Sequence, residues 1–211
     1  MQLGQLDLEQ INKELRDKAP EAIIRWALSL NKKVIMTTSF GYNSAVSLHM
    51  LANIDRSVPV VWVDSGYNVK DAYLVAETLM KSLSLTMKIY NPLMSAERRN
   101  AIMGGIPSID DEHFDAFVEQ VKLEPFARAL QELKPQVWIT GIRQEETEHR
   151  RNLDIVSIDG RGILKVAPLF YWNDEQVNAY MQQHDLPSCK HYFDPTKVHE
   201  HRECGLHTVG H

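Results

Sequence analysis

The sequence of 211 residues has few cysteines and no excess of positive charge. Cys189 and Cys204 are its two cysteines, too few for a disulfide framework in a chain of this length. They are also too few for an iron–sulfur cluster held by four thiolates. The formal net charge of −5 gives no sign of binding to nucleic acids or anionic membranes. Any anion site must therefore be a local cluster of arginine and lysine.

Long hydrophobic runs and a secretory signal are absent as well. No apolar stretch approaches the ~18 residues that a membrane-spanning helix needs. The acidic N-terminus, residues 1–8, has no basic segment followed by an apolar one, so we expect that it is not a signal peptide. Length and an apolar content of 44% fit one globular domain with a substantial core. We expect a cytoplasmic protein.

Short apolar segments alternate with segments of helical periodicity along most of the chain. Strands are predicted at residues 34–38, 58–63, 85–90 and 136–140, with a small hairpin at 155–158 and 162–166. Helices are predicted at 8–18, 20–30, 44–53, 69–83, 123–133 and 172–184, the last capped by Asn173. Strands that are apolar throughout and alternate with helices indicate an α/β fold with a parallel, doubly wound, Rossmann-like sheet. We expect a domain over residues 1–185 and a flexible C-terminal tail over 186–211.

Three turns follow strand ends of this predicted sheet, where open α/β folds bind their ligands. The first, residues 39–44, joins a strand to a helix, and such turns bind anions through backbone N–H groups. Its candidate binding residues are Ser39, Phe40, Gly41 and Ser44. The turn lacks the Gly-Lys-Ser/Thr ending of the nucleoside-triphosphatase P-loop and the dinucleotide Gly-x-Gly-x-x-Gly pattern. An ordinary connecting turn is the alternative.

The second turn contains Asp64, Gly66 and Tyr67, as candidates for the rim of the site. The alternative for Asp64 is a helix cap. The third turn begins a basic cluster that carries Arg143, Arg150 and Arg151. Arginine binds phosphate and sulfate oxygens by planar, paired hydrogen bonds that lysine cannot reproduce. Because acidic residues alternate with them, Arg150 and Arg151 could also belong to an exposed charged helix.

A lysine within an apolar strand and a cysteine near the C-terminus complete the candidates. Lys165 lies in a predicted buried strand, where its charge needs a partner, and a bound anion would be such a partner. Cys204 is surrounded in the sequence by ionisable residues: Arg202, His207, His199, His201 and His211. Positive neighbours favour the reactive thiolate. A tail position suits a cysteine that must meet two partners. The histidine spacing matches no common zinc site, so we expect no metal.

These motifs together resemble the phosphoadenylyl-sulfate (PAPS) reductase family. The turn at 39–44 resembles its degenerate PP-loop, of the adenine-nucleotide α-hydrolase type, and residues 64–67 resemble its Asp-Thr-Gly-Tyr element. Residues 141–143 and 150–153 are similar to its Gly-(Leu/Ile)-Arg and Arg-x-Asn-Leu elements, with Arg150 fitting the spacing better than Arg151. Residues 165–168 are similar to Lys-Val-x-Pro, and 202–207 to the C-terminal signature.

The resemblance implies a thioredoxin-dependent reductase of assimilatory sulfate reduction. The Cys204 thiolate would attack the sulfur of PAPS, release adenosine 3′,5′-bisphosphate and form a thiosulfonate that thioredoxin (or glutaredoxin) resolves to sulfite. His207 and Arg202 would assist Cys204, although an exposed position is the alternative for each. The resemblance implies an enzyme that has no bound cofactor and no iron–sulfur cluster. A homodimer is implied, and residues 6–30 offer apolar helical surface either for a partner or for the chain's own core.

One departure from the family leaves the substrate open. The segment between the last helix and Cys204, residues 186–201, is shorter than in family members. A cluster-free reductase of adenylyl sulfate (APS) is therefore the nearest alternative. An ATP-dependent enzyme of the same fold is disfavoured because Phe40 and Asn43 replace residues of the ATP-type loop. A non-catalytic nucleotide sensor with a redox-active tail is a further alternative. Cys189 is expected to be a bystander.

Overall fold

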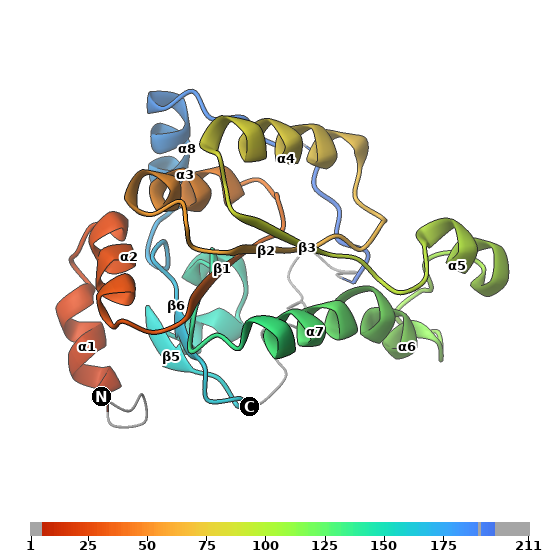
Figure 1. Ribbon diagram of the computed structural model, residues 1–211, viewed down its shortest axis with the longest axis horizontal. Coiled ribbons are helices and arrows are strands. Elements are labelled where there is room, and N and C mark those ends of the chain that lie inside the picture. Colours follow the sequence, from red (N-terminus) through yellow and green to blue (C-terminus); the bar gives the residue numbers. More distant parts are fainter. Residues whose placement is uncertain (1–5, 190, 197–211) are drawn as a thin grey trace.

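The computed structural model describes residues 6–189 and 191–196, which form a six-stranded sheet with helices on both faces (Figure 1). The strand order is β3-β2-β1-β4-β6-β5. The strands are β1 (Val34–Thr38), β2 (Val60–Val63), β3 (Met87–Tyr90), β4 (Val137–Ile139), β5 (Val156–Ile158) and β6 (Leu164–Val166). All pairings are parallel except β5 with β6. The predicted parallel α/β sheet and the small hairpin are confirmed.

Alternate residues of the strands supply two hydrophobic cores, one on each face of the sheet. On one face, Met36, Val60 and Ile139 join the larger core with α2 (Pro20–Ser29), α3 (Ser44–Ile54), α4 (Lys70–Leu83) and α8 (Asp174–Gln183). On the other face, Ile35 and Trp138 pack with α7 (Glu124–Leu133). Figure 1 shows α3, α4 and α8 above the sheet and α7 below it. This is the period-two pattern of a sheet buried on both sides.

The N-terminal helices cover the chain's own core and one edge of the sheet. Ile23, Ile24 and Ala27 of α2 are buried in the larger core. In α1 (Leu8–Leu15), the Asn12 side chain accepts a hydrogen bond from the backbone N–H of Val156 at 2.8 Å and donates one to the Val156 carbonyl at 2.9 Å. The amide thereby satisfies backbone groups of the edge strand β5, which limits pairing of that edge with another chain.

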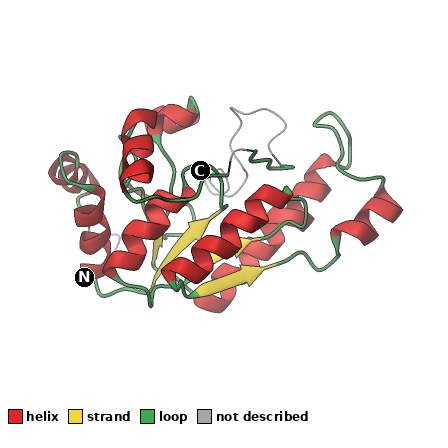
Figure 2. Ribbon diagram, turned by 90° about the horizontal axis from the view of Figure 1, so that it is seen from above, coloured by secondary structure: helices red, strands yellow, loops and turns green. Residues whose placement is uncertain are grey.

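The middle of the chain contains one helix that the sequence patterns did not predict, whereas the acidic residues 110–112 indicate a helix start and a helix begins close by at Phe114. Helix α5 (Ala96–Met103) begins at the N-cap Ser95 and ends at Gly104, which has a left-handed backbone. Figure 2 shows the helices of this region at one end of the molecule. The chain then continues as α6 (Phe114–Val118), a π-helical segment η2 (Glu119–Leu123) and α7 without a break. The π-helical segment is relevant to the site because Lys122 lies within it.

The last helix is confirmed at its predicted start. The Asn173 side chain accepts a hydrogen bond from the Gln176 backbone N–H at 2.9 Å, and the Gln176 side chain accepts one from the Asn173 N–H. Beyond α8, Cys189, Asp194 and Thr196 are buried. Packing therefore extends past residue 185, the predicted domain boundary. Within the described part of the chain, no helix has the length and apolar character needed to cross a membrane.

Candidate functional site

A cavity of about 730 Å³ lies beyond the carboxyl ends of β1 and β4. The chain runs from β1 to β2 and β3 on one side, and from β4 to β6 and β5 on the other. The gap between β1 and β4 is therefore the topological switch point, where open α/β sheets bind ligands. The first and third predicted turns meet at this place.

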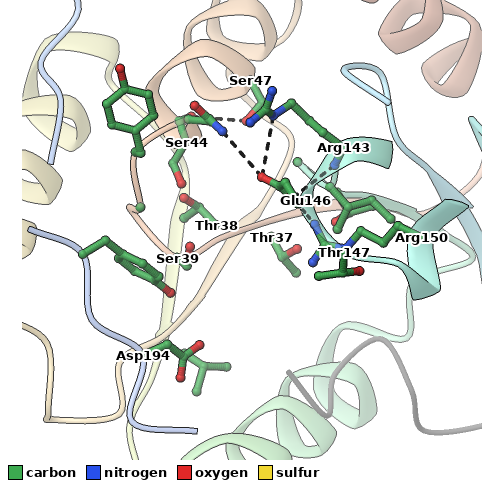
Figure 3. A pocket seen from close by; sticks show the side chains of 18 of the residues that line it. Thr37, Thr38, Ser39, Ser44, Ser47, Arg143, Glu146, Thr147, Arg150 and Asp194 are labelled. Carbon is green, nitrogen blue, oxygen red and sulfur yellow. Dashed lines mark hydrogen bonds and ion pairs between the residues drawn. The ribbon is translucent and has the colours of Figure 1, made fainter. Parts of the chain in front are cut away.

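Hydroxyl groups line the end of the cavity formed by β1 and the start of α3 (Figure 3). They belong to Thr37, Thr38, Ser39, Ser44 and Ser47. The α3 N-terminus opens into the same space, so its backbone N–H groups and dipole add to these donors. The predicted residues Ser39, Gly41 and Ser44 all line the cavity. Hydroxyl donors at a helix N-terminus suit a phosphate or sulfate group.

Phe40 supports this turn from behind instead of lining the cavity. Its backbone φ of 50° lies in the left-handed region, and its side chain is fully buried. The ring packs edge-on against Trp62 with a centroid separation of 4.9 Å. The Phe40 N–H donates to Thr38 Oγ1 at 3.1 Å. An aromatic residue in this backbone conformation needs such packing to hold it, so its side chain fixes the turn.

Arg143 and Arg150 line the opposite part of the wall and share a carboxylate. Arg143 donates to Glu145 Oε1 and Asp174 Oδ1, each at 2.7 Å, and its Nε lies 3.6 Å from Glu146 Oε1. Arg150 forms an ion pair with Glu146. Only 5% and 4% of these two arginine side chains is exposed. Arg151 is exposed and does not line the cavity, so the structure separates the two adjacent arginines.

A buried ion pair lines the cavity on the side away from Arg143 and Arg150 (Figure 3). Lys122 of η2 pairs with Asp194, which also accepts from the Thr196 N–H at 3.0 Å and the Thr196 hydroxyl at 2.7 Å. Burial alone would raise the pKa of the Asp194 carboxyl. The Lys122 charge and the hydrogen bonds from Lys122 and Thr196 outweigh burial and hold that pKa below its ordinary value. Residues 194–196, in the first part of the predicted tail, are thereby fixed to the cavity wall.

Asp64, Gly66 and Tyr67 do not line the cavity. The Asp64 carboxylate accepts from the Gly66 N–H at 3.0 Å, Asn68 Nδ2 at 2.9 Å and the Tyr73 hydroxyl at 2.8 Å. Burial, together with this bond to Asp64, raises the pKa of Tyr73 to about 12. The Tyr67 hydroxyl donates to Asn100 at 2.9 Å. Asp64 thus organises the turn after β2, and a contact with substrate stays a prediction.

Lys165 lies within the sheet instead of at the cavity surface. Its ammonium lies 5.3 Å from the centroid of the Trp138 ring on β4, and only 3% of the residue is exposed. A cation over an indole face is stabilised by the ring quadrupole. This contact offers the buried lysine a partner within the protein. The prediction that Lys165 binds an anion stays untested.

Several lining residues were not predicted from the sequence. They are Thr37, Thr38, Ser47, Lys122, Thr140, Glu145, Glu146, Thr147, Asp174, Tyr192 and Asp194. Ser47 follows Ser44 by three residues, and this helical spacing could have identified it. Lys122 and Asp194 carry no comparable signal, since their meeting depends on the π-helical segment and on the course of residues 191–196.

The proposed nucleophile and its helpers, Cys204, His207 and Arg202, lie outside the described residues. Cys189 is described and buried, and burial raises the pKa of its thiol, which fits a non-reactive thiol. Among the described residues, no group of three or more histidine, cysteine or acidic side chains could hold a metal ion. The site that can be built from them is a cavity whose hydroxyl and guanidinium donors suit an anionic ligand.

Comparison with known proteins identifies the family. Residues 33–196 match the model of the phosphoadenosine phosphosulfate reductase domain. The chain is 37% identical to the phosphoadenosine 5′-phosphosulfate reductase of Synechocystis sp., over 88% of this chain and 75% of that protein. The PAPS reductase of Candida auris, crystallised as a phosphate complex, superposes with a TM-score of 0.77 at 26% identity, covering 88% of this chain and 89% of that one.

A more distant neighbour shows the fold alone. The FMN adenylyltransferase of Candida glabrata has a TM-score of 0.53 at 15% identity, covering 75% of this chain and 49% of that one. It shares the sheet architecture, as expected for the PP-loop type.

The match to the family model spans the cavity residues from Thr37 to Asp194. The chain therefore belongs to the phosphoadenosine phosphosulfate reductase family and is an enzyme of the oxidoreductase class.

Proposed function

We propose that this chain reduces 3′-phosphoadenylyl sulfate to sulfite and adenosine 3′,5′-bisphosphate, with thioredoxin as the electron donor. The observation that carries the proposal is the cavity at the β1–β4 switch point, with Arg143 and Arg150 facing the hydroxyl-lined turn after β1. Phosphate and sulfate oxygens are suitable acceptors for both sets of donors. Val61, Val63 and Phe126 give the cavity an apolar wall that suits an adenine ring.

The chemistry would use the chain's second cysteine. The Cys204 thiolate attacks the sulfate sulfur, the S–O bond to the nucleotide breaks, and adenosine 3′,5′-bisphosphate leaves with the bonding electron pair. The enzyme then carries a Cys204–S–SO₃⁻ thiosulfonate. A thioredoxin thiolate attacks Sγ of Cys204 and sulfite leaves with the electron pair of the S–S bond. The second thioredoxin thiol releases the enzyme, so the dithiol supplies both electrons and becomes a disulfide.

Residues 191–196 support a role for the C-terminal segment at the cavity. Asp194 is paired with Lys122. The Tyr192 ring lies close to Gly41, because a Cβ added at that glycine would lie 3.3 Å from the ring. Cys204 follows Asp194 by ten residues, so the chain that carries it leaves from the cavity wall. We propose that residues 197–211 bring Cys204 to the substrate and then present it to thioredoxin.

The test is sulfite release with thioredoxin and thioredoxin reductase, giving PAPS and APS separately to wild type, Cys204→Ser and Cys189→Ser. We expect sulfite from PAPS, loss of it in Cys204→Ser and retention in Cys189→Ser. Sulfite formed mainly from APS would replace PAPS by APS as the substrate. Absence of sulfite from both nucleotides, despite nucleotide binding, would refute the reductase proposal and favour a non-catalytic sensor.

APS remains a second candidate because of one observation on charge. Each lysine and arginine among the described cavity residues already has a carboxylate partner. A 3′-phosphate adds negative charge to the ligand, which such a cavity must accommodate by exchange of partners. APS carries no 3′-phosphate and requires less of this exchange.

A further inference from the structure

The charge of the cavity wall is unexpected for a site that takes a nucleotide with several negative groups. The lining residues that the structure describes include three basic side chains, Lys122, Arg143 and Arg150. They also include four acidic side chains, Glu145, Glu146, Asp174 and Asp194. With all of these groups in their ordinary ionised states, the acidic side chains outnumber the basic ones. An anionic ligand therefore meets arginines whose charges are already compensated.

Glu146 differs from the other three carboxylates because it contacts both arginines of the site. It pairs with Arg150, and its Oε1 lies 3.6 Å from Arg143 Nε. Glu145 and Asp174 pair with Arg143 from more exposed positions, with side chains 48% and 70% exposed, against 30% for Glu146. Figure 3 shows Arg143, Glu146 and Arg150 grouped on one side of the cavity and Asp194 on the other.

A carboxylate between two guanidinium groups has the chemistry of a bound anion. Its oxygens take N–H donors that phosphate or sulfate oxygens would otherwise take, because arginine offers the same paired donors to both. We propose that Glu146 is a specificity-determining residue that competes with an anionic group of the nucleotide for Arg143 and Arg150. This inference rests on the proposed function, since it takes an adenine nucleotide as the ligand of the cavity.

Glu146 also has a structural contact, and this contact allows a clean substitution. Its Oε2 accepts a hydrogen bond from the Arg143 backbone N–H at 3.2 Å, at the start of the 3₁₀-helix η3 (Gln144–Glu146). The amide oxygen of glutamine can accept the same hydrogen bond at the same chain length. Glu146→Gln therefore removes the charge while it keeps the cap. Glu148→Gln is the matched control, because Glu148 lies in the same loop, is exposed and does not line the cavity.

The experiment is calorimetric titration of the full chain with adenosine 3′,5′-bisphosphate, and separately with AMP. We expect Glu146→Gln to lower the dissociation constant of the bisphosphate by roughly three- to tenfold, the range expected from removing one repulsive, partly exposed charge. Glu148→Gln should stay within about twofold of wild type, as expected for an exposed charge outside the site. If Glu146→Gln lowers the dissociation constant of AMP as well, the group that competes with Glu146 is the 5′-phosphate. If it lowers the dissociation constant of the bisphosphate alone, the competing group is the 3′-phosphate.

An unchanged or higher dissociation constant in Glu146→Gln would overturn the inference and assign Glu146 to support of the arginines. Thermal unfolding of each variant checks that it is folded. Glu146→Ala is a second variant that removes the charge together with the cap, and where it is folded we expect its affinity to change in the same direction. Failure of the reductase proposal has a different signature, which is the absence of sulfite from both nucleotides. Failure of the nucleotide site itself would leave the wild-type protein with no affinity for either nucleotide.

Discussion

The ammonium of Lys122 and the carboxylate of Asp194 form an ion pair with side chains only 11% and 4% exposed, although the two residues are 72 positions apart in the chain. Lys122 comes from the π-helical segment below the sheet, and Asp194 from the segment that follows α8. Two further hydrogen bonds from Thr196 satisfy the carboxylate. A buried pair of this kind specifies one position for the segment, because each charge is costly to bury without the other.

Asp194→Asn should destabilise the protein, because it leaves the Lys122 ammonium buried without its counter-charge. Removing one partner of a buried ion pair typically costs about 3–5 kcal/mol. We expect a lower free energy of unfolding, measured by urea denaturation, close to the bottom of that range because the asparagine oxygen can still accept from Thr196. The double variant Lys122→Met/Asp194→Asn should recover part of the loss. Equal stability of Asp194→Asn and wild type would show that the pair does not hold the segment.

The same pair predicts a dependence of stability on pH. The pKa of Asp194 is lower in the folded protein than its ordinary value, because of Lys122 and Thr196 acting against burial. A lowered pKa contributes stability above the unfolded value of ~4, and this contribution is lost as the pH falls from there through the folded pKa. The stability difference between wild type and Asp194→Asn should therefore be constant near pH 6 and shrink below pH ~4. Urea denaturation at several pH values measures it, and a difference that grows toward acid pH would contradict the assignment.

The sequence alone predicted the sheet, its parallel direction and the turns at its switch point, because these follow from local patterns. Short apolar runs rich in β-branched residues, such as residues 34–38, favour buried strands, and the carboxyl ends of adjacent parallel strands meet at one edge. The same reasoning placed Arg143 and Ser39 at the site. The helix at Ala96–Met103 was missed because only Arg99 is buried there, so no apolar periodicity marks it.

Other parts of the site could not be read from the sequence, because they depend on which partners meet in space. The charge pattern did not separate Arg150 from Arg151, although the family resemblance favoured Arg150 by its spacing. The fold buries Arg150 and exposes Arg151. Glu146 was taken as one of several acidic residues in a charged segment. Its position against two arginines follows from the path of the two 3₁₀ turns after β4. The Lys122–Asp194 pair likewise joins segments that have no local relationship.

A substitution at Gly41 should disturb the cavity more than one at Gly141, although both glycines line it. A Cβ at Gly41 would lie 3.3 Å from Ser39 Oγ and from the Tyr192 ring, closer than ordinary contact. A Cβ at Gly141 would lie 3.6 Å from Ser47 Oγ, an ordinary contact distance. We expect Gly41→Ala to raise KM for the nucleotide by about tenfold, since it forces a shift of the turn or of Tyr192. Steady-state sulfite release checks both variants, and a larger effect at Gly141 would contradict this account.

Arg150 and Arg151 provide the sharpest test of the site, because they are adjacent and chemically identical but differently placed. Arg150 lines the cavity with 4% of its side chain exposed, whereas Arg151 is exposed to solvent. Hydrogen bonds to charged groups contribute about 1.5–3 kcal/mol each, so Arg150→Gln should raise the dissociation constant of the nucleotide by roughly 10- to 100-fold. Arg151→Gln should change it by less than about twofold, as expected for an exposed charge.

The comparison also separates binding from folding. Loss of Arg150 leaves Glu146 without one of its partners, so the thermal unfolding midpoint of each variant must be measured beside its nucleotide affinity. Lysine at position 150 keeps the charge but cannot reproduce paired hydrogen bonds. Compared with Arg150→Gln, Arg150→Lys should therefore recover more of the lost folding stability than of the lost nucleotide affinity. If Arg150→Gln and Arg151→Gln weaken binding equally, the ligand does not contact the buried arginine, and the anion site must be sought elsewhere along the cavity wall.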